Sequence, residues 1–278
     1  MFFHDGETVA AILAGGRIAL PQLELRMLLG HATKLSRVQM ITQSGRSLKN
    51  DEIQRLNDLC ARRMAGEPIA YLIGEREFFG LSLHVDPAVL IPRPETELLV
   101  ELAMRYLPKG GRVLDMGTGS GAIAVAIAHT RPDAVVTALD VSEAALAVAR
   151  SNARDNNVTM RLLRSDWFSA LNGDDRFDLI VSNPPYIVAG DAHLSEGDLR
   201  FEPVDALTDH ADGLSALRTI CRHAPAHLER HGWLLMEHGY DQAAAVRQLL
   251  IDQGFEEVQS WKDLAGIERV SGGKRPAT

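Results

Sequence analysis

A proline-containing turn follows an apolar, strand-like run in the segment 178–187, which reads DLIVSNPPYI. Pro184 and Pro185 fix the backbone and carry no N–H groups, so the carbonyl groups of the turn have no local donors. The side-chain oxygen of Asn183 and the carbonyl of Pro184 can therefore act as two acceptors for a planar NH2 group. Tyr186 can pack against the flat face of that group. The turn predicts a site that orients an amide or amino nitrogen.

Methyl transfer from a sulfonium is the chemistry that suits such a turn. The nitrogen lone pair has to lie in line with the S–CH3 bond, with the reacting atoms about 3 Å apart. The lone pair of an amide or exocyclic amine is delocalised, so acceptors that polarise both N–H bonds lower the barrier. Asn-Pro turns also end strands for structural reasons alone. The complete N-P-P-Y sequence, downstream of a glycine-rich loop, favours the catalytic interpretation.

The glycine-rich loop lies in segment 113–126, VLDMGTGSGAIAVA. It joins a predicted strand to a predicted helix, where glycines let a ligand approach the backbone and the helix start offers unpaired N–H groups. The candidate cofactor residues in it are Gly117, Thr118, Gly119, Ser120 and Gly121. The string also satisfies the dinucleotide pattern G-x-G-x-x-G/A. The loop alone therefore does not separate a nicotinamide dinucleotide from S-adenosylmethionine.

Acidic residues end the next two predicted strands. Asp140 closes VVTALD, where a carboxylate can accept hydrogen bonds from both hydroxyls of a ribose. Asp166 and Trp167 follow in RSDWF, where the carboxylate can accept from an adenine amino group while the indole covers the base. The structural alternatives are helix caps at both acids and a core aromatic at Trp167.

Three segments with different hydrophobic patterns make up the chain. Residues 1–76 show helical spacing only, which predicts a small helical bundle, and residues 77–92 read as a hairpin or linker. Residues 93–278 alternate strands with helices, which predicts a doubly wound, Rossmann-like parallel sheet in an α/β domain. Strand-like segments after Gly254 and Gly266 need a short connection, so the C-terminal end of the sheet should contain an antiparallel strand.

Composition excludes several classes of protein. The 278 residues are 46% hydrophobic and 24% charged, with a net charge of -8, so no global positive field attracts a nucleic-acid backbone. Cys60 and Cys221 are the only cysteines, and the ten histidines show no metal-ligand spacing, so we expect no metal site and a cytoplasmic location. No run approaches roughly 18 apolar residues, so we expect no membrane span. We also expect a monomer.

The motifs SNPPYI, DMGTGSGAIA and LIPRPETELLVE, together with the helical N-terminus, closely resemble the HemK/PrmC peptide chain release factor glutamine methyltransferases. The resemblance covers nearly the whole chain. It implies a class I methyltransferase fold with S-adenosylmethionine as cofactor. It also implies methylation of N5 of the glutamine in the Gly-Gly-Gln motif of class I release factors, which modulates translation termination. The N-terminal bundle would then recognise the protein substrate.

Carried over residue by residue, the resemblance implies that Asn183 to Tyr186 hold the glutamine. It assigns the cofactor's methionine and ribose parts to Gly117–Gly121 and Asp140, and the adenine to Trp167. The RPETE segment, 93–97, resembles a flap, which adds three candidate cofactor residues: Arg93, Glu95 and Thr96. Pro94 and Glu95 could equally be an ordinary helix start.

Three other functions remain open from the sequence. N-P-P-Y is shared with DNA amino-methyltransferases of the N6-adenine type, although the acidic chain lacks the basic surface that phosphate contacts require, and we expect no direct nucleic-acid contact. The glycine loop also permits an NAD-dependent dehydrogenase. The third is a catalytically silent binding module that keeps the fold as a scaffold.

Overall fold

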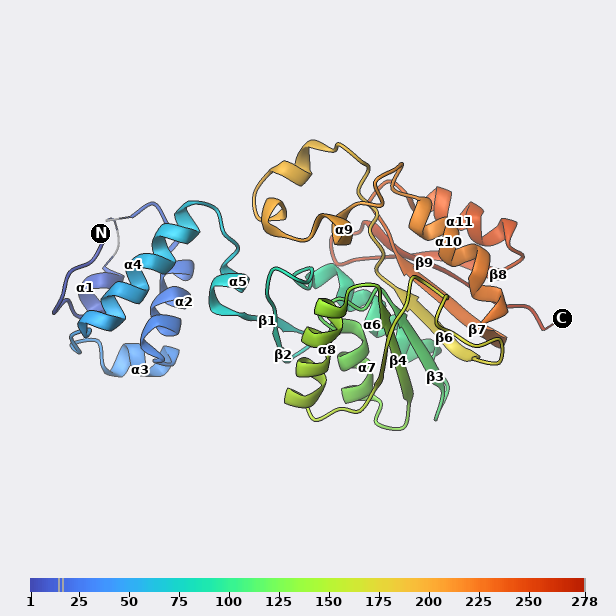
Figure 1. Cartoon of the computed structure of the whole chain (residues 1–278), viewed down its shortest axis with the longest axis horizontal. Helices are drawn as coiled ribbons and strands as arrows, with labels where there is room; N and C mark the ends of the chain where they lie inside the picture. The colour runs from blue at the N-terminus through green and yellow to red at the C-terminus, as the bar shows by residue number, and fades with distance from the viewer. Residues whose placement is uncertain (15, 17, 278) are drawn as a thin grey trace. The chain divides into compact units, whose positions relative to one another are not determined.

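The structure is a computed structural model that describes residues 1–14, 16 and 18–277. It contains two compact units, 1–75 and 76–278, which we describe separately (Figure 1). In the described part of the chain, no helix is long and apolar enough to cross a membrane.

The first unit consists of helices around a small apolar core. The helices are α1 Val9–Leu13, α2 Gln22–Thr33, α3 Arg37–Thr42, α4 Asn50–Met64 and α5 Ile69–Ile73. On α4, Ile53, Leu56 and Cys60 are buried at helical spacing. Cys60 therefore packs in the core, and burial raises the pKa of its thiol to about 11.

A seven-stranded sheet forms the centre of the second unit. Its strand order is β5-β4-β3-β6-β7-β9-β8. The strands are β3 Arg112–Met116, β4 Val135–Asp140, β5 Arg161–Arg164, β6 Phe177–Ser182, β7 Leu228–Glu237, β8 Glu256–Lys262 and β9 Glu268–Lys274. Neighbouring strands from β5 to β7 are parallel, whereas β9 is antiparallel to both β7 and β8. The predicted doubly wound sheet with an antiparallel strand near its C-terminal end is confirmed.

Helices cover both faces of this sheet. They are α6 Glu97–Tyr106, α7 Ala122–Thr130, α8 Glu143–Asp155, α9 Val204–Leu207, α10 Ser215–His223 and α11 Ala243–Asp252. Short 3-10 turns are η1 Pro94–Thr96, η2 Ala192–Ser195, η3 Leu199–Phe201 and η4 Ala224–Ala226.

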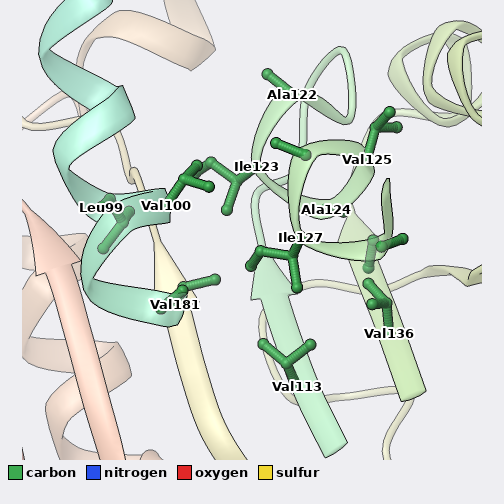
Figure 2. Close-up of a cluster of buried hydrophobic side chains, with 14 of the residues drawn as sticks. Leu99, Val100, Val113, Ala122, Ile123, Ala124, Val125, Ile127, Val136 and Val181 are labelled. Atoms are coloured by element: carbon green, nitrogen blue, oxygen red, sulfur yellow. The ribbon is translucent and has the colours of Figure 1, made fainter. Parts of the chain in front are cut away.

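Alternation along the strands explains why there are two helical layers. On β6, Leu179 and Val181 pack with α6 and α7, whereas Ile180 packs with α10 and α11. Figure 2 shows side chains of α6 and α7 meeting those of β3, β4 and β6 in the first layer. Because both faces are covered, the central strands read as continuous apolar runs.

A two-stranded sheet precedes the central sheet in the chain, and the side-chain amide of Asn152 connects it to α8. Its strands are β1 Glu75–Phe78 and β2 Leu81–His84. The buried Asn152 of α8 accepts from the backbone N–H of His84 at 2.7 Å and donates to the carbonyl of His84 at 3.0 Å. It also donates to the carbonyl of Ser120 at 2.8 Å. One side chain therefore connects this hairpin, α8 and the glycine-rich loop.

The two motifs meet because β3 and β6 are adjacent and parallel. Met116 is the register partner of Ser182, so the residues that follow them, Gly117 and Asn183, leave the sheet side by side. Ligands bind beyond the carboxyl ends of strands in such sheets. The glycine-rich loop and the Asn-Pro-Pro-Tyr turn therefore begin at the same edge of the sheet.

Candidate active site

A cavity of about 280 Å³ lies at the carboxyl ends of β3, β4 and β6. It brings together seven of the residues predicted from the sequence: Gly117, Gly119, Asp140, Asp166, Trp167, Asn183 and Pro185. The other lining residues come from segments 88–90, 139–145 and 203–206, and from Met116 and Ser165.

The glycines of the loop have two different tasks. Gly117 and Gly119 have φ of +70° and +54°, and a Cβ added at either would meet no atom within 4 Å. They leave open space on the cavity side, where a ligand can approach the backbone. Gly121 has φ of +82°, and a Cβ there would lie 3.1 Å from Cβ of Ala149. The third glycine therefore permits close packing of the loop on α8.

Thr118 and Ser120 are buried within the loop. Thr118 Oγ1 donates to Oδ2 of Asp115 at 2.6 Å, while the Ser120 carbonyl accepts from Asn152. Burial raises the pKa of Asp115 to about 7, and the nearby Asp140 adds to the increase. Among the described residues, Thr118, Ser120 and Gly121 do not line the cavity, so their geometry supports a role in shaping the loop.

Asp140 is held by two backbone groups at the base of the cavity. Its Oδ2 accepts from the N–H of Gly119 at 2.8 Å, and its Oδ1 accepts from the N–H of Ser142 at 2.9 Å. The carboxylate oxygens retain lone pairs for a ligand. Burial raises the pKa of Asp140, while these backbone hydrogen bonds oppose the increase. Ser142, not Asp140, provides the N-cap of α8, by accepting from Ala145 N.

The cavity is acidic. Asp140, Asp166 and Asp205 are among its lining residues, and the lining residues that the structure describes include no Lys or Arg. A cationic ligand such as a sulfonium is favoured there, whereas the diphosphate of a dinucleotide is repelled. The indole of Trp167 and apolar residues such as Leu139 and Ala206 supply surfaces for a base. The residues present therefore fit S-adenosylmethionine better than NAD.

The Asn-Pro-Pro-Tyr turn forms another part of the cavity wall. Asn183 Nδ2 donates to Oγ1 of Thr96 at 3.2 Å, which directs the amide nitrogen toward η1 and leaves the oxygen as the free end. Tyr186 Oη donates to Oε1 of Glu237 at 3.2 Å. Burial, and then the Glu237 carboxyl, raise the pKa of Tyr186, so its hydroxyl remains a donor. In the described lining, Pro185 and Asn183 are present and Pro184 and Tyr186 are not.

The turn is held in place by groups outside the cavity. Gln242 Nε2 donates to the carbonyl of Tyr186 at 3.1 Å and to that of Gly213 at 3.2 Å. Gly213 has φ of +77°, and a Cβ there would lie 2.5 Å from the Tyr186 carbonyl oxygen. Only glycine allows this close approach, so the backbone position of Tyr186 depends on Gly213 and Gln242.

Arg93, Glu95 and Thr96 are outside the cavity lining in the part of the chain that the structure describes. Arg93 forms an ion pair with Glu202, Glu95 is exposed, and Thr96 contacts Asn183. Pro94 begins η1, which runs directly into α6, as the helix-start interpretation expects. Direct contact of these three residues with the cofactor stays a prediction.

Sequence reasoning missed Glu202, which connects two walls of the cavity. Its Oε2 accepts from the backbone N–H of Ile91 at 3.0 Å, and its Oε1 pairs with Arg93. Ile91 follows the lining segment 88–90, and Glu202 precedes the lining segment 203–206. Burial raises the pKa of Glu202, and the positive charge of Arg93 opposes that increase. The only local signal was a lone acid before a proline in FEP.

Comparisons with known proteins agree with this geometry. A model of the methyltransferase small domain matches residues 94–197, and a model of the PrmC N-terminal domain matches residues 7–74. The release factor glutamine methyltransferase of Burkholderia pseudomallei is 56% identical over 265 residues, which are 92% of this chain and 93% of that protein. The enzyme of that name from Bordetella pertussis is 54% identical over 256 residues, 91% and 95% of the two chains.

Solved structures show the same fold at lower identity. A methyltransferase from Pyrococcus furiosus has a TM-score of 0.55 and 24% identity, with 78% of this chain and 97% of that chain covered. The T. thermophilus 16S rRNA N2 G1207 methyltransferase, in complex with AdoMet and guanosine, has a TM-score of 0.55 and 23% identity, with 72% and 49% covered. The class I methyltransferase fold expected from the sequence is confirmed.

Proposed function

This chain belongs to the release factor glutamine methyltransferase family, and we propose that it methylates N5 of the glutamine in the Gly-Gly-Gln motif of class I peptide chain release factors. The methyl donor is S-adenosylmethionine. The observation that carries the proposal is the orientation of Asn183, whose amide nitrogen is bonded to Thr96 while its oxygen is left for an NH2 group. The acidic cavity beside this amide suits a cationic methyl donor.

The proposed cofactor residues each have a role that follows from their position. When bound, S-adenosylmethionine supplies the sulfonium methyl group. Gly117 and Gly119 allow its methionine part to approach the backbone, and Asp140 accepts from the ribose hydroxyls. Asp166 accepts from the adenine amino group, and Trp167 covers the base.

The turn then orients the substrate amide. Asn183 Oδ1 and the Pro184 carbonyl accept from the two hydrogens of the glutamine NH2 group, which fixes the plane of the amide. Polarising both N–H bonds favours the pyramidal nitrogen that develops in the transition state, so these acceptors bind that state more strongly than the planar amide. Pro185 and the ring of Tyr186 exclude water from the flat faces of the group.

The helical N-terminal part, residues 1–76, is proposed to recognise the release factor, with 77–92 as the linker and 93–278 as the methyltransferase domain. Exposed apolar side chains support the first role, since Leu23, Val38 and Ile41 are 69%, 67% and 69% exposed. Val38 and Ile41 are three residues apart on α3 and so share one face of that helix. A monomeric, cytoplasmic enzyme that acts on translation components fits this organisation.

Mass spectrometry of a purified class I release factor tests the function. Incubation with enzyme and S-adenosylmethionine should add one methyl group to the Gly-Gly-Gln glutamine. Asn183→Ala should abolish the modification while S-adenosylhomocysteine binding stays within about tenfold of wild type, because the lost acceptor orients the substrate and not the cofactor. The matched control is Asn172→Ala, an exposed asparagine in the loop before β6.

Two results would contradict the proposal. One is a release factor that stays unmodified by wild-type enzyme that binds the cofactor. The other is methylation of duplex DNA at adenine amino groups under the same conditions, which would instead support the DNA amino-methyltransferase interpretation.

A further inference from the structure

A buried histidine at the end of β7 has no role in the function proposed above. His238 directly follows the last residue of β7 and is 0% exposed. Its Nδ1 lies 2.9 Å from the carbonyl oxygen of Gly239, and its Nε2 lies 2.7 Å from Oγ of Ser271 on β9. Both ring nitrogens have a partner, so the nature of these partners decides which nitrogen carries the proton.

One tautomer of the ring satisfies every group in this cluster. A carbonyl oxygen only accepts, so Nδ1 of His238 must donate to Gly239. In a neutral ring Nε2 then only accepts, so the hydroxyl of Ser271 donates to it. Oγ of Ser260 lies 2.7 Å from Oγ of Ser271 and accepts from Nη1 of Arg247 at 2.6 Å. The hydrogen bonds therefore run in one direction, from the guanidinium on α11 through two serines to the histidine.

The surroundings of His238 keep its ring neutral near pH 7. Burial lowers the pKa of His238 from its usual value of 6.5, and the positive charges of Arg269 and Arg247 add to the decrease. The Gly239 carbonyl and the Glu268 carboxylate oppose it. A protonated ring would donate from Nε2 and reverse the serine chain toward the Arg247 guanidinium, which itself only donates.

Gly239 connects the histidine to the Asn-Pro-Pro-Tyr turn. Its N–H donates to Oε1 of Gln242 at 2.8 Å, and its carbonyl accepts from the backbone N–H of Gln242 at 3.1 Å as well as from His238. A Cβ added at Gly239 would lie 3.1 Å from Gln242 Oε1, so the amide packs closely on this backbone. With Oε1 held there, Nε2 of Gln242 donates to the carbonyls of Tyr186 and Gly213.

Loss of the Nδ1 donor would release this connection. The Gly239 carbonyl would keep only the Gln242 N–H, and glycine tolerates rotation of the peptide groups on either side of it. Rotation of the Gly239 N–H moves Oε1 of Gln242 and, with it, the Nε2 that holds Tyr186. The turn would then shift, together with the acceptors at Asn183 and Pro184 that face the substrate amide.

We propose that His238, as its Nδ1-protonated tautomer, is a positioning residue that holds Gly239 and Gln242 behind the turn and so aligns the glutamine for methyl transfer. The proposal rests on the function proposed above, since the turn orients the substrate amide there. His238 lies outside the described cavity lining and acts through Tyr186, without contact with the substrate or the cofactor.

Two substitutions of His238 separate positioning from packing, because both remove the same ring. Asparagine places its NH2 group where Nδ1 lies and can still donate to Gly239, whereas glutamine places its amide near Nε2 and leaves Gly239 without this donor. On a purified release factor, His238→Gln should lower kcat by about 10- to 100-fold, and His238→Asn should keep kcat within about threefold of wild type. The KM for S-adenosylmethionine should stay within about threefold in both variants.

His227→Gln is the matched control. Nδ1 of His227 also lies beside a backbone carbonyl, that of Asp175 at 3.1 Å, but His227 precedes β7 at the amino end of the strand. The kcat of this variant should equal that of wild type. The double variant His238→Gln/Gln242→Met should be no slower than Gln242→Met alone, because both changes break one chain.

Nitrogen NMR of the full chain tests the tautomer without an activity assay. In protein with 15N-labelled histidine, Ser271→Ala identifies the His238 ring, since its signals should move in that variant. In wild type near pH 7, these signals should show a protonated Nδ1 and an unprotonated Nε2. If His238→Gln does not fold, this measurement still tests the proposal, because a proton on Nε2 would overturn it.

Wild-type activity separates this proposal from the proposed function. If wild type does not methylate the release factor glutamine, the function is wrong and the positioning role falls with it. If wild type is active and His238→Gln keeps the wild-type kcat, only the positioning role is overturned. Losses of kcat that are equal in His238→Asn and His238→Gln would also overturn it, since packing alone would then explain both.

Discussion

Replacing Asp140 with asparagine should weaken cofactor binding while the protein stays folded. Both carboxylate oxygens accept backbone N–H groups, one from Gly119 at 2.8 Å and one from Ser142 at 2.9 Å. Asparagine has a single acceptor atom, so one of the two N–H groups would face an NH2 group. Because Ser142 begins α8, the amide oxygen should stay with Ser142 and the loop at Gly119 should move.

The size of the effect follows from the bonds that are lost. A hydrogen bond to a charged group contributes about 1.5–3 kcal/mol, and one such bond orders the loop around the ligand. The ribose hydroxyls also lose a charged acceptor. Since 1.4 kcal/mol corresponds to a factor of ten, the Kd for S-adenosylhomocysteine should rise by about 10- to 100-fold.

Isothermal titration calorimetry with S-adenosylhomocysteine measures this change directly. The matched control is Asp174→Asn, an exposed acid in the loop before β6, which removes the same charge far from the carboxyl ends of the strands. Its Kd should equal that of wild type. An unchanged Kd for Asp140→Asn would refute the ribose assignment, and an equal loss in both variants would attribute the effect to net charge.

Three further substitutions test the supports of the site. Gly121→Ala places a Cβ 3.1 Å from Cβ of Ala149, at a φ of +82°. It should lower the free energy of unfolding by about 1–3 kcal/mol and weaken S-adenosylhomocysteine binding. A urea unfolding midpoint equal to that of wild type would contradict this. Gly213→Ala places a Cβ 2.5 Å from the Tyr186 carbonyl oxygen. The kcat on a release factor should therefore fall, while the affinity for S-adenosylhomocysteine stays within about threefold. Equal losses of kcat and affinity would mean that the whole cavity has moved. Glu202→Gln keeps an acceptor for the Ile91 N–H but leaves Arg93 without its counter-charge. The free energy of unfolding in urea should fall by about 1–3 kcal/mol. A change below about 0.5 kcal/mol would show that solvent replaces the ion pair between Arg93 and Glu202.

The sequence was sufficient for the parts of the fold that depend on local patterns. Apolar runs ending at Gly117, Asp140 and Asn183 predict strands, and parallel strands carry their functional loops at one edge. The register Met116 to Ser182 then brings the two motifs together. Gly119, Asp140, Trp167 and Asn183 line one cavity because of this topology.

Long-range pairs were beyond the reach of local patterns. Glu202 and Arg93 are 109 residues apart, and Glu237 and Tyr186 are 51 residues apart. An isolated glutamate is usually a solvated surface residue, so nothing in the flanking sequence marks these two as buried. The hydrogen bond between Thr96 and Asn183, 87 residues apart, is likewise a long-range contact that the sequence did not indicate.

Topology alone also leaves the chemistry of the turn undetermined. Strand register fixes where the Cα atom of Asn183 lies, yet rotating its side-chain amide by half a turn exchanges oxygen and nitrogen at nearly constant shape. One orientation accepts from an NH2 group and the other repels it. The choice depends on the group that faces Nδ2, which here is Thr96. The chemistry of the Asn-Pro-Pro-Tyr turn therefore depends on a hydroxyl 87 residues away in the chain, which the motif itself does not reveal.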